Sequence, residues 1–318
     1  MNTKRDNLWL VGSGQMGAEY AKILNTLNIK YKVIGRGKKS ASVFRKNTNK
    51  EVVTGGLKEI LKKLSAPKNA IVAVNVEKLK ETTELLLKHG TKRILLEKPG
   101  GINFSEIFSL YQLSLKKRSK VFIAYNRRFY SSVMKLKNLC QNKNKISNIF
   151  FDFSEWSHVV EKAQQKKTVK SKWLIANSSH VIDLAFYLAG KPKQLNVYKK
   201  GSLKWHKTAS SFCGSGLTEK GIIFSYNSDW KSPGRWGLEI MTSNYRFILR
   251  PLESLKFIKK ASIKIKDIRL KNKYDIKFKP GLYFQTKNFL EFQEENLCTL
   301  KQQVKNIEIY SKIGGYNL

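Results

Sequence analysis

A lysine stands where the sequence predicts the end of a buried strand. The apolar run 94–96 leads into Glu97, Lys98 and Pro99. A lysine held in such a place, partly desolvated and near other cations, has a lowered pKa that suits it to proton transfer. Pro99 restricts Lys98 to an extended conformation and permits a cis bond in a tight turn. Lys98 is therefore a candidate catalytic residue, although a strand-end lysine on its own is more often a surface group.

A second candidate group lies on segment 178–189, whose apolar pattern predicts a largely buried helix. His180, Asp183 and Tyr187 share one face of this helix, because they are three and four residues apart. Polar groups on a buried helix must find partners, either in the fold or in a ligand. This face is thus a candidate site, in which Asp183 and Tyr187 are also consistent with structural roles.

A glycine pattern of the form G-x-G-x-x-G follows the apolar run 8–11 and opens a predicted helix at 15–27. The first glycine allows a tight turn, the second lets a pyrophosphate approach the backbone, and the third permits close helix–strand packing. The helix N-terminus then faces the anion. The pattern predicts a dinucleotide site that comprises Gly12, Ser13, Gly14, Gln15, Met16 and Gly17.

The end of the second predicted strand indicates which dinucleotide is bound. NAD-binding versions of the pattern place an acidic residue about 20 positions further on, to hold the ribose 2′-hydroxyl. Here strand 31–34 runs into Arg36, Lys38 and Ser40, with no carboxylate between 31 and 40. An arginine with neighbouring donors suits a 2′-phosphate. We therefore expect NADP(H) to be favoured, with NAD(H) possible.

The elements that must position these residues fall into two groups. Residues 8–124 alternate short apolar strands with helices, which predicts an α/β domain with a doubly wound parallel sheet. Residues beyond 124 carry longer, alternating, aromatic-rich strands and few helices, which predicts an α+β domain with an open, mostly antiparallel sheet. We expect a dinucleotide-binding domain at 1–124 and a substrate-binding or oligomerisation domain at 125–318.

Taken together, these motifs resemble a known family. The glycine pattern, Glu97-Lys98-Pro99, the run 125–129 (Tyr-Asn-Arg-Arg-Phe) after a strand, and the His-x-x-Asp on a second-domain helix are similar to the Gfo/Idh/MocA oxidoreductases. The resemblance implies a Rossmann domain followed by an open-faced, mostly antiparallel sheet. It also implies hydride transfer between a nicotinamide cofactor and a hydroxyl of a sugar, cyclitol or nucleotide sugar.

The resemblance implies roles for individual residues. Lys98 and His180 would be the proton-handling pair, and Asn126 and Arg127 would lie near the nicotinamide or the substrate. We also expect Asn75, Glu97 and Lys98 to contact the cofactor. The expected substrate contacts are Lys98, Tyr125, Asn177, His180 and Asp183.

One position departs from the family pattern. Members commonly carry an Asp four residues before the histidine, whereas this chain has Ala176. Asn177 can hydrogen-bond a substrate but cannot act as a base. Two interpretations follow: a proton relay of Lys98 and His180 without a carboxylate, or a non-catalytic regulator or scaffold that binds the cofactor.

The net charge is large but poorly diagnostic. The 318 residues include 50 Lys and 11 Arg against 23 Asp and Glu, a formal charge of +38. Dispersed lysine lacks the bidentate geometry used in base recognition, so we expect no specific nucleic-acid binding. Segment 256–279, with ten basic and two acidic residues, predicts strands at 262–266 and 274–279 with one basic face. The lysines between Val159 and Trp173 are equally consistent with an anionic substrate and with a solvated surface.

The remaining features set the broad class. Three cysteines without a C-x-x-C pair argue against a disulfide framework and a cysteine-rich zinc site, and we expect no metal. Apolar runs are too short for a membrane span, and no signal peptide is expected. We expect a cytoplasmic homodimer or homotetramer that acts on a small sugar-like molecule. Of Trp156, Trp230 and Trp236, we expect at least two to serve in packing and the remainder to be free to stack on a sugar ring.

Overall fold

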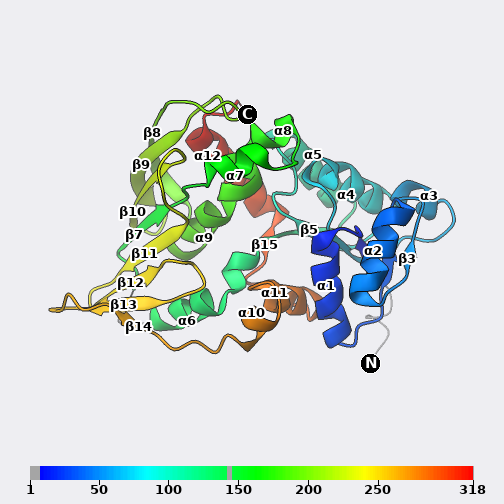
Figure 1. The fold of residues 1–318 in the computed structure, drawn as a ribbon, viewed down its shortest axis with the longest axis horizontal. Helices are drawn as coiled ribbons and strands as arrows, with labels where there is room; N and C mark the ends of the chain where they lie inside the picture. The colour runs from blue at the N-terminus through cyan, green and yellow to red at the C-terminus, as the bar shows by residue number, and fades with distance from the viewer. Residues whose placement is uncertain (1–7, 142–144, 318) are drawn as a thin grey trace. The chain divides into compact units, whose positions relative to one another are not determined.

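The computed structural model describes residues 8–141 and 145–317. This part of the chain divides into two compact units, coloured along the sequence in Figure 1. The first unit holds the described residues up to Tyr125 together with Lys277–Ile307, and the second holds Asn126–Ile276 and the described residues from Glu308. A single boundary at 124/125 therefore does not describe the division. Segment 277–307 returns to the first unit because its strand β15 (Cys298–Thr299) pairs with β6 (Lys120–Ala124).

The first unit contains a seven-stranded sheet in the order β15-β6-β5-β4-β1-β2-β3. All described pairs are parallel except β15 with β6, so the expected parallel sheet gains one antiparallel edge strand. The order β3-β2-β1-β4-β5-β6 is that of the Rossmann fold. The other strands are β1 (Leu8–Val11), β2 (Lys32–Ile34), β3 (Val52–Val53), β4 (Asn69–Val72) and β5 (Arg93–Glu97). Their apolar residues are mostly buried, as parallel strands covered on both faces require.

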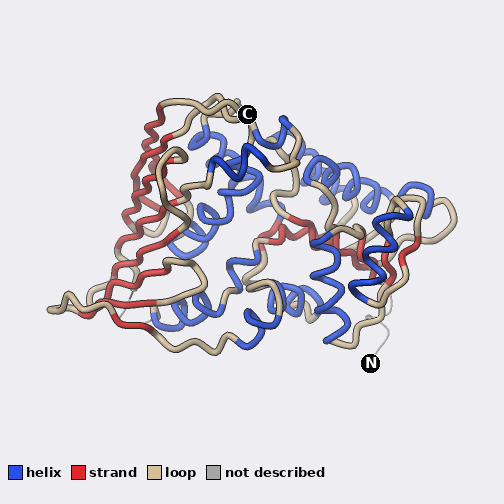
Figure 2. The backbone as a smooth tube through the Cα atoms, in the orientation of Figure 1, coloured by secondary structure: helices blue, strands red, loops and turns tan. Residues whose placement is uncertain are grey.

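Helices connect these strands, as the blue and red segments of Figure 2 show. They are α1 (Gln15–Thr26), α2 (Lys38–Thr48), α3 (Leu57–Leu61), η1 (Val76–Lys78), α4 (Leu79–Lys88), α5 (Phe104–Lys116) and α11 (Leu282–Leu290). Asn103 caps the N-terminus of α5, because its Oδ1 accepts a 2.9 Å hydrogen bond from the amide of Glu106. Arg93 fastens the returning segment. Its guanidinium donates to the carbonyl of Phe289 at 2.9 Å and pairs with Glu294 at 3.0 Å.

The second unit contains an eight-stranded sheet in the order β14-β13-β12-β11-β7-β10-β9-β8. Only the β7–β10 pair is parallel among the described residues, so the expected mostly antiparallel sheet is confirmed. The strands are β7 (Asn148–Asp152), β8 (Pro192–Lys200), β9 (Ser211–Thr218), β10 (Ile223–Asp229), β11 (Gly237–Met241), β12 (Tyr245–Leu249), β13 (Lys256–Lys259) and β14 (Lys266–Asp267).

Short helices and one long buried helix accompany this sheet. They are η2 (Asn126–Phe129), α6 (Ser131–Leu139), α7 (Ser157–Lys162), α8 (Lys167–Lys170), the π-helical turn η4 (Leu174–Ser178), α9 (Ser179–Ala189) and α10 (Lys273–Lys277). Helix α9 packs on β7, where the ring of Phe186 lies 5.7 Å from that of Phe151. Within the described residues, no helix has the length and apolar character needed to cross a membrane.

Two sequence predictions for the C-terminal half were wrong. Residues 262–265 form an irregular connection between β13 and β14, and residues 273–277 form helix α10 instead of a strand. The alternating apolar and polar residues at 262–266 do not pack against a core, since Ile263 is 94% exposed. Asp275 on α10 instead accepts a 2.8 Å hydrogen bond from the amide of Ser131 at the start of α6. Helix α12 (Leu300–Gly314), which leaves the first unit and ends in the second, was not predicted.

Candidate active site

The turn between β1 and α1 has the glycine geometry of a phosphate-binding loop. Gly12 has φ +122°, and a Cβ there would collide with the carbonyl oxygen of Ala73. A Cβ on Gly17 would collide with the carbonyl oxygen of Gly12. A Cβ on Gly14 would meet nothing within 4 Å. The protein itself therefore requires the first and third glycines, whereas the open space at the second leaves room for a ligand to approach the backbone.

The carboxyl end of β2 exposes donors beside this turn. The side chains of Arg36, Lys38 and Ser40 are exposed, and the first turn of α2 has no acidic residue. Ser13 of the glycine turn donates a 3.2 Å hydrogen bond to Ser40, whose hydroxyl donates to the carbonyl of Gly37. The two loops thus form one polar surface with no carboxylate from 31 to 40.

Lys98 follows β5 at the same edge of the sheet as the glycine turn. The parallel register pairs Val11 with Val72 and Val72 with Leu96, so both strands end at this edge. The side chain of Lys98 is partly buried, and the Lys98–Pro99 bond is cis. Asn75 follows β4 at this edge, and its side chain is exposed.

Glu97 is linked to the helix that begins at the glycine turn. The hydroxyl of Tyr20 on α1 donates a 2.7 Å hydrogen bond to Oε1 of Glu97. Burial raises the pKa of Glu97, and the charges of Lys98 and Lys279 oppose this shift. Lys279, whose Nζ lies 3.1 Å from Sδ of Met16, reaches the site from the returning segment. Sequence reasoning missed Lys279 because it expected a strand there.

Tyr125 contributes to packing in the first unit. Its buried hydroxyl accepts a 3.1 Å hydrogen bond from Nε2 of Gln303, which also donates to the carbonyl of Pro99 at 2.9 Å. Through Gln303 on α12, the backbone after Lys98 is fixed to the end of β6. These contacts favour a positioning role for Tyr125 over direct substrate contact.

The remaining predicted residues lie in the second unit. Asn126 is buried on η2, and its Oδ1 accepts a 3.2 Å hydrogen bond from Arg127. His180 is buried near the start of α9. The pairing of His180 with Lys98, which belongs to the first unit, stays a prediction.

Asp183 is engaged in a buried ion pair. Both of its oxygens accept hydrogen bonds from Arg128, at 2.8 Å from Nε and 2.6 Å from Nη2, and the two side chains are 1% and 4% exposed. This bidentate contact fastens η2, and with it Asn126 and Arg127, to α9. The geometry favours the structural role for Asp183.

Sequence reasoning missed a buried carboxylate, Glu155. Its oxygens accept hydrogen bonds from Asn177 at 3.0 and 3.3 Å, from Ser178 at 2.7 Å, and from Arg235 at 2.8 Å. Asn177, expected to contact substrate, thus commits its amide nitrogen to Glu155. Ala176 supplies no carboxylate to this turn. The carboxylate of Glu155, which follows β7, contacts the turn instead. No sequence spacing reveals it, because its partners lie 22, 23 and 80 residues away.

Cations and aromatic rings alternate next to Glu155. Cζ of Arg235 lies 5.1 Å from the ring centroid of Trp156 and 4.3 Å from that of Trp236. Cζ of Arg127 lies 4.6 Å from Trp236, and the ring of His180 lies 6.0 Å from it. Trp236 is buried, whereas Trp156 is 51% exposed. With Trp230 also buried, Trp156 is the one of the three expected tryptophans that a sugar ring can reach.

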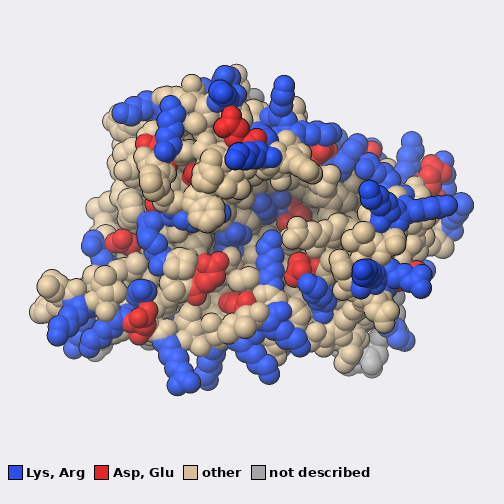
Figure 3. Space-filling model, viewed as in Figure 1, with Lys and Arg blue, Asp and Glu red and all other residues tan. Residues whose placement is uncertain are grey.

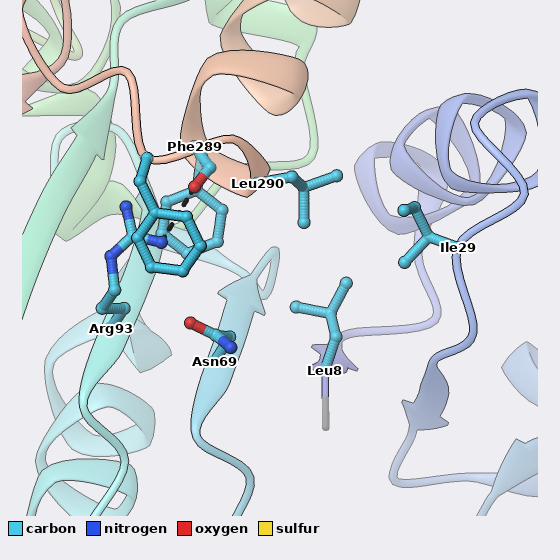
Figure 4. A pocket seen from close by; sticks show the side chains of 7 residues that line it. Leu8, Ile29, Asn69, Arg93, Phe289 and Leu290 are labelled. Atoms are coloured by element: carbon cyan, nitrogen blue, oxygen red, sulfur yellow. Dashed lines mark hydrogen bonds between the residues drawn. The ribbon is translucent and has the colours of Figure 1, made fainter. Parts of the chain in front are cut away.

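A small cavity lies away from these residues. Its volume is about 20 Å³. Leu8, Asn69 and Arg93 line it from the strands, and Phe289 and Leu290 line it from α11 (Figure 4). Each of the three is the first residue of its strand, so the cavity lies at the amino edge of the sheet, opposite Lys98. A cavity of this size holds about one water molecule. It has no part in the candidate site.

Basic side chains are scattered over the surface. Figure 3 shows Lys and Arg on many elements of the visible face. This agrees with the interpretation of most of the charge as a solvated surface.

The family comparison agrees with the fold and the glycine turn. Residues 7–125 match the family model of the Gfo/Idh/MocA proteins, which is described as an oxidoreductase family with an NAD-binding Rossmann fold. The resemblance expected from the sequence is confirmed over this range. The match covers the Rossmann strands and helices up to residue 125.

Solved structures share the fold across nearly the whole chain. UDP-N-acetylglucosamine 3-dehydrogenase GnnA from Acidithiobacillus ferrooxidans is 10% identical, with a TM-score of 0.75 over 97% of this chain and 96% of that one. Levoglucosan dehydrogenase in complex with NADH is 14% identical, with a TM-score of 0.77 over 96% and 95%. The WlbA dehydrogenase from Chromobacterium violaceum, in complex with NADH and UDP-GlcNAcA, is 12% identical, with a TM-score of 0.71 over 97% and 92%. The sequence matches none of the curated proteins with which it was compared.

Proposed function

We propose that the chain is a nicotinamide-dependent dehydrogenase or reductase that interconverts a hydroxyl and a ketone on a sugar-like substrate. The observation that carries the proposal is the open turn at Gly14 together with Lys98 at the same edge of one sheet. The relatives of like fold that act on levoglucosan and on UDP-N-acetylglucosamine support a sugar or nucleotide sugar as substrate. We assign cofactor binding to the first unit and substrate binding mainly to the second.

The side chains divide the work as follows. The glycine turn and the first residues of α1 hold the pyrophosphate of the cofactor, which supplies hydride chemistry when bound. Nζ of Lys98 exchanges a proton with the substrate hydroxyl, and His180 assists. Arg127 and Asn126 orient the nicotinamide or the substrate.

We further propose that NADP(H) is the preferred cofactor. The support is the exposed set Arg36, Lys38 and Ser40 at the start of α2, where no carboxylate is available for a ribose 2′-hydroxyl. A guanidinium and a lysine beside a helix N-terminus suit a dianionic phosphate. NAD(H) binding remains compatible with the same turn.

Cofactor titration tests this preference. We expect NADPH to bind at least about tenfold more tightly than NADH, a difference that two or three charge-assisted contacts readily supply. Arg36→Ala should abolish the difference by weakening NADPH alone, whereas Arg45→Ala, at the other end of α2, should leave both affinities unchanged. Equal or tighter binding of NADH by the unaltered protein would refute the preference.

Hydride exchange tests the activity. Labelled NADPH is incubated with a panel of sugars and nucleotide sugars, and transfer of label to product is measured. Lys98→Ala should abolish turnover and leave the cofactor Kd nearly intact, while Lys92→Ala, at the opposite end of β5, should retain turnover. Unimpaired turnover in Lys98→Ala would refute the mechanism. Tight cofactor binding without exchange on any substrate would instead favour a cofactor-bound regulator.

A further inference from the structure

The second unit holds a carboxylate that the proposed reaction does not yet use. Glu155 follows β7 and is 2% exposed. A carboxylate removed from water needs several donors to remain ionised. Asn177, Ser178 and Arg235 supply these donors, and each donates toward an oxygen of Glu155.

The charge of Glu155 results from two opposing influences. Burial raises its pKa, while the guanidinium of Arg235 and the hydrogen bonds from Ser178 and Asn177 lower it. The charge of Arg127 also interacts with Glu155, and burial lowers the pKa of Arg127 itself. Asn177, Ser178 and Arg235 all donate to Glu155, so hydrogen-bond donors surround the carboxylate when it is ionised, while burial remains the larger influence on its pKa.

Glu155 contacts the turn that precedes His180 directly and is linked to the ring beside His180 through Arg235. Asn177 and Ser178 are the last two residues of η4, and α9 begins with Ser179 directly before His180. Arg235, the ion-pair partner of Glu155, stacks on Trp236, and the ring of Trp236 lies 6.0 Å from that of His180. One carboxylate therefore fixes the turn that leads into His180 and the stack that lies against its ring.

We propose that Glu155 is the positioning residue of His180. It holds the end of η4, which leads into His180, in place, and it supplies a negative charge that favours the protonated imidazole. The part played in turnover rests on the proposed function. The effect on the titration of His180 follows from the contacts within the second unit alone.

The titration of His180 tests the proposal without any substrate. The full chain is labelled in its four histidines, and the ring protons are followed by NMR across pH, with His180→Asn assigning the signal. Glu155→Gln keeps the size of the side chain and removes its charge. We expect the pKa of His180 to fall by about half a unit or more, because the substitution removes a negative charge held by Ser178, two residues before His180, and loss of negative charge disfavours a protonated imidazole.

Asp152→Asn is the matched control for this measurement. Asp152 is the last residue of β7, three residues before Glu155, and pairs with Arg250 at 3.1 Å, so the substitution also removes one carboxylate from an arginine pair. It should leave the pKa of His180 at its wild-type value. A shift in Glu155→Gln no larger than that in Asp152→Asn would overturn the proposal.

Kinetics separate the failure of this inference from that of the proposed function. With an active substrate, Glu155→Gln should lower kcat about tenfold or more, move the acidic limb of the pH profile to lower pH, and leave KM within about twofold. Glu155→Asp, which keeps the charge, should have a kcat and an acidic limb of the pH profile that lie between those of Glu155→Gln and the unaltered protein. An unchanged kcat and profile in Glu155→Gln would contradict the inference. A wild-type protein inactive on every sugar would contradict the proposed function, while the NMR titration would still decide the role of Glu155.

Discussion

The hydroxyl of Tyr20 donates a 2.7 Å hydrogen bond to Oε1 of Glu97. Tyr20 belongs to the helix that begins at the glycine turn, and Glu97 directly precedes Lys98. The glycine turn and the candidate catalytic lysine are therefore joined by a partly buried side-chain contact as well as by the sheet. Burial and the neighbouring carboxylate raise the pKa of Tyr20, so its hydroxyl remains the donor over the working pH range.

Removal of this hydroxyl should affect both stability and turnover. Tyr20→Phe leaves a desolvated carboxylate with one donor fewer, and we expect a loss of about 1–3 kcal/mol in the free energy of unfolding, measured with denaturant. We also expect kcat to fall, because Lys98 loses a fixed neighbour. Tyr31→Phe is the control, since that hydroxyl bonds to Asn25 at 2.9 Å on a partly buried surface. Equal kcat values for the two variants would show that the link does not serve Lys98.

The buried carboxylates predict the sign of a pH effect on stability. Burial raises the pKa of Glu97 and Glu155 above the ordinary value of 4.5, so the folded state binds more protons than the unfolded state just above that pH. Their contribution to stability is present below pH 4.5 and is lost as the pH rises through the raised pKa values. In Glu97→Gln the free energy of unfolding should fall less steeply above pH 4.5 than in the unaltered protein. The pKa of Glu84 is lowered by Lys80 and Lys88, so its contribution to stability is lost as the pH falls below 4.5. In Glu84→Gln the free energy of unfolding should therefore fall less steeply below pH 4.5 than in the unaltered protein. A steeper fall in Glu97→Gln would contradict the assignment.

The three glycines of the turn should respond differently to alanine. Gly14→Ala adds a Cβ to open space, so we expect stability to change by less than about 0.5 kcal/mol while cofactor affinity falls tenfold or more. Gly17→Ala forces a methyl group against the carbonyl of Gly12 and should cost about 1–3 kcal/mol of stability. Thermal unfolding and cofactor titration separate the two effects. Undiminished cofactor binding in Gly14→Ala would argue against phosphate binding at this turn.

The Arg128–Asp183 pair should behave as a buried structural contact. Asp183→Asn leaves Arg128 without its ionic partner, and we expect a loss of about 3–5 kcal/mol. The double variant Arg128→Met with Asp183→Leu should recover most of this loss, because it buries no charge. Glu51→Gln, which breaks an exposed pair with Arg45, should have no measurable effect. If Asp183→Asn proved as stable as the unaltered protein and lost substrate affinity, Asp183 would be a substrate contact after all.

Trp156 should contribute to substrate affinity more than to the chemical step. Its exposed ring lies beside Arg235 and next in the chain to Glu155, where a sugar face can stack on it. Trp156→Ala should raise KM for the sugar about fivefold and leave kcat within about twofold. Val159→Ala is the control, because Val159 is an exposed apolar residue on helix α7, which begins directly after Trp156. An unchanged KM in Trp156→Ala would exclude stacking.

The parts of the site that could be predicted from sequence are those in which local spacing carries the chemistry. The glycine turn, the missing acid near Arg36 and the strand-end Lys98 are each contained in about ten residues. Glu155 could not be found in this way, because a buried carboxylate is recognised only by donors that the fold brings from elsewhere. The alternation at 274–279 misled for a related reason: Asp275 on α10 bonds to the amide of Ser131, a partner 144 residues away that the local pattern does not reveal. The oligomeric state stays a prediction.

The path of the chain has a consequence for how such a protein can be divided. The backbone passes between the two units after Tyr125, before Lys277 and after Ile307. A fragment that ended at Tyr125 would lack β15, and the backbone of β6 that pairs with Cys298 and Thr299 would become an open edge, prone to add foreign strands. Neither unit is encoded by one uninterrupted stretch. An exchange of the second unit between relatives by recombination would therefore require two coordinated segments, Asn126–Ile276 and the described residues from Glu308.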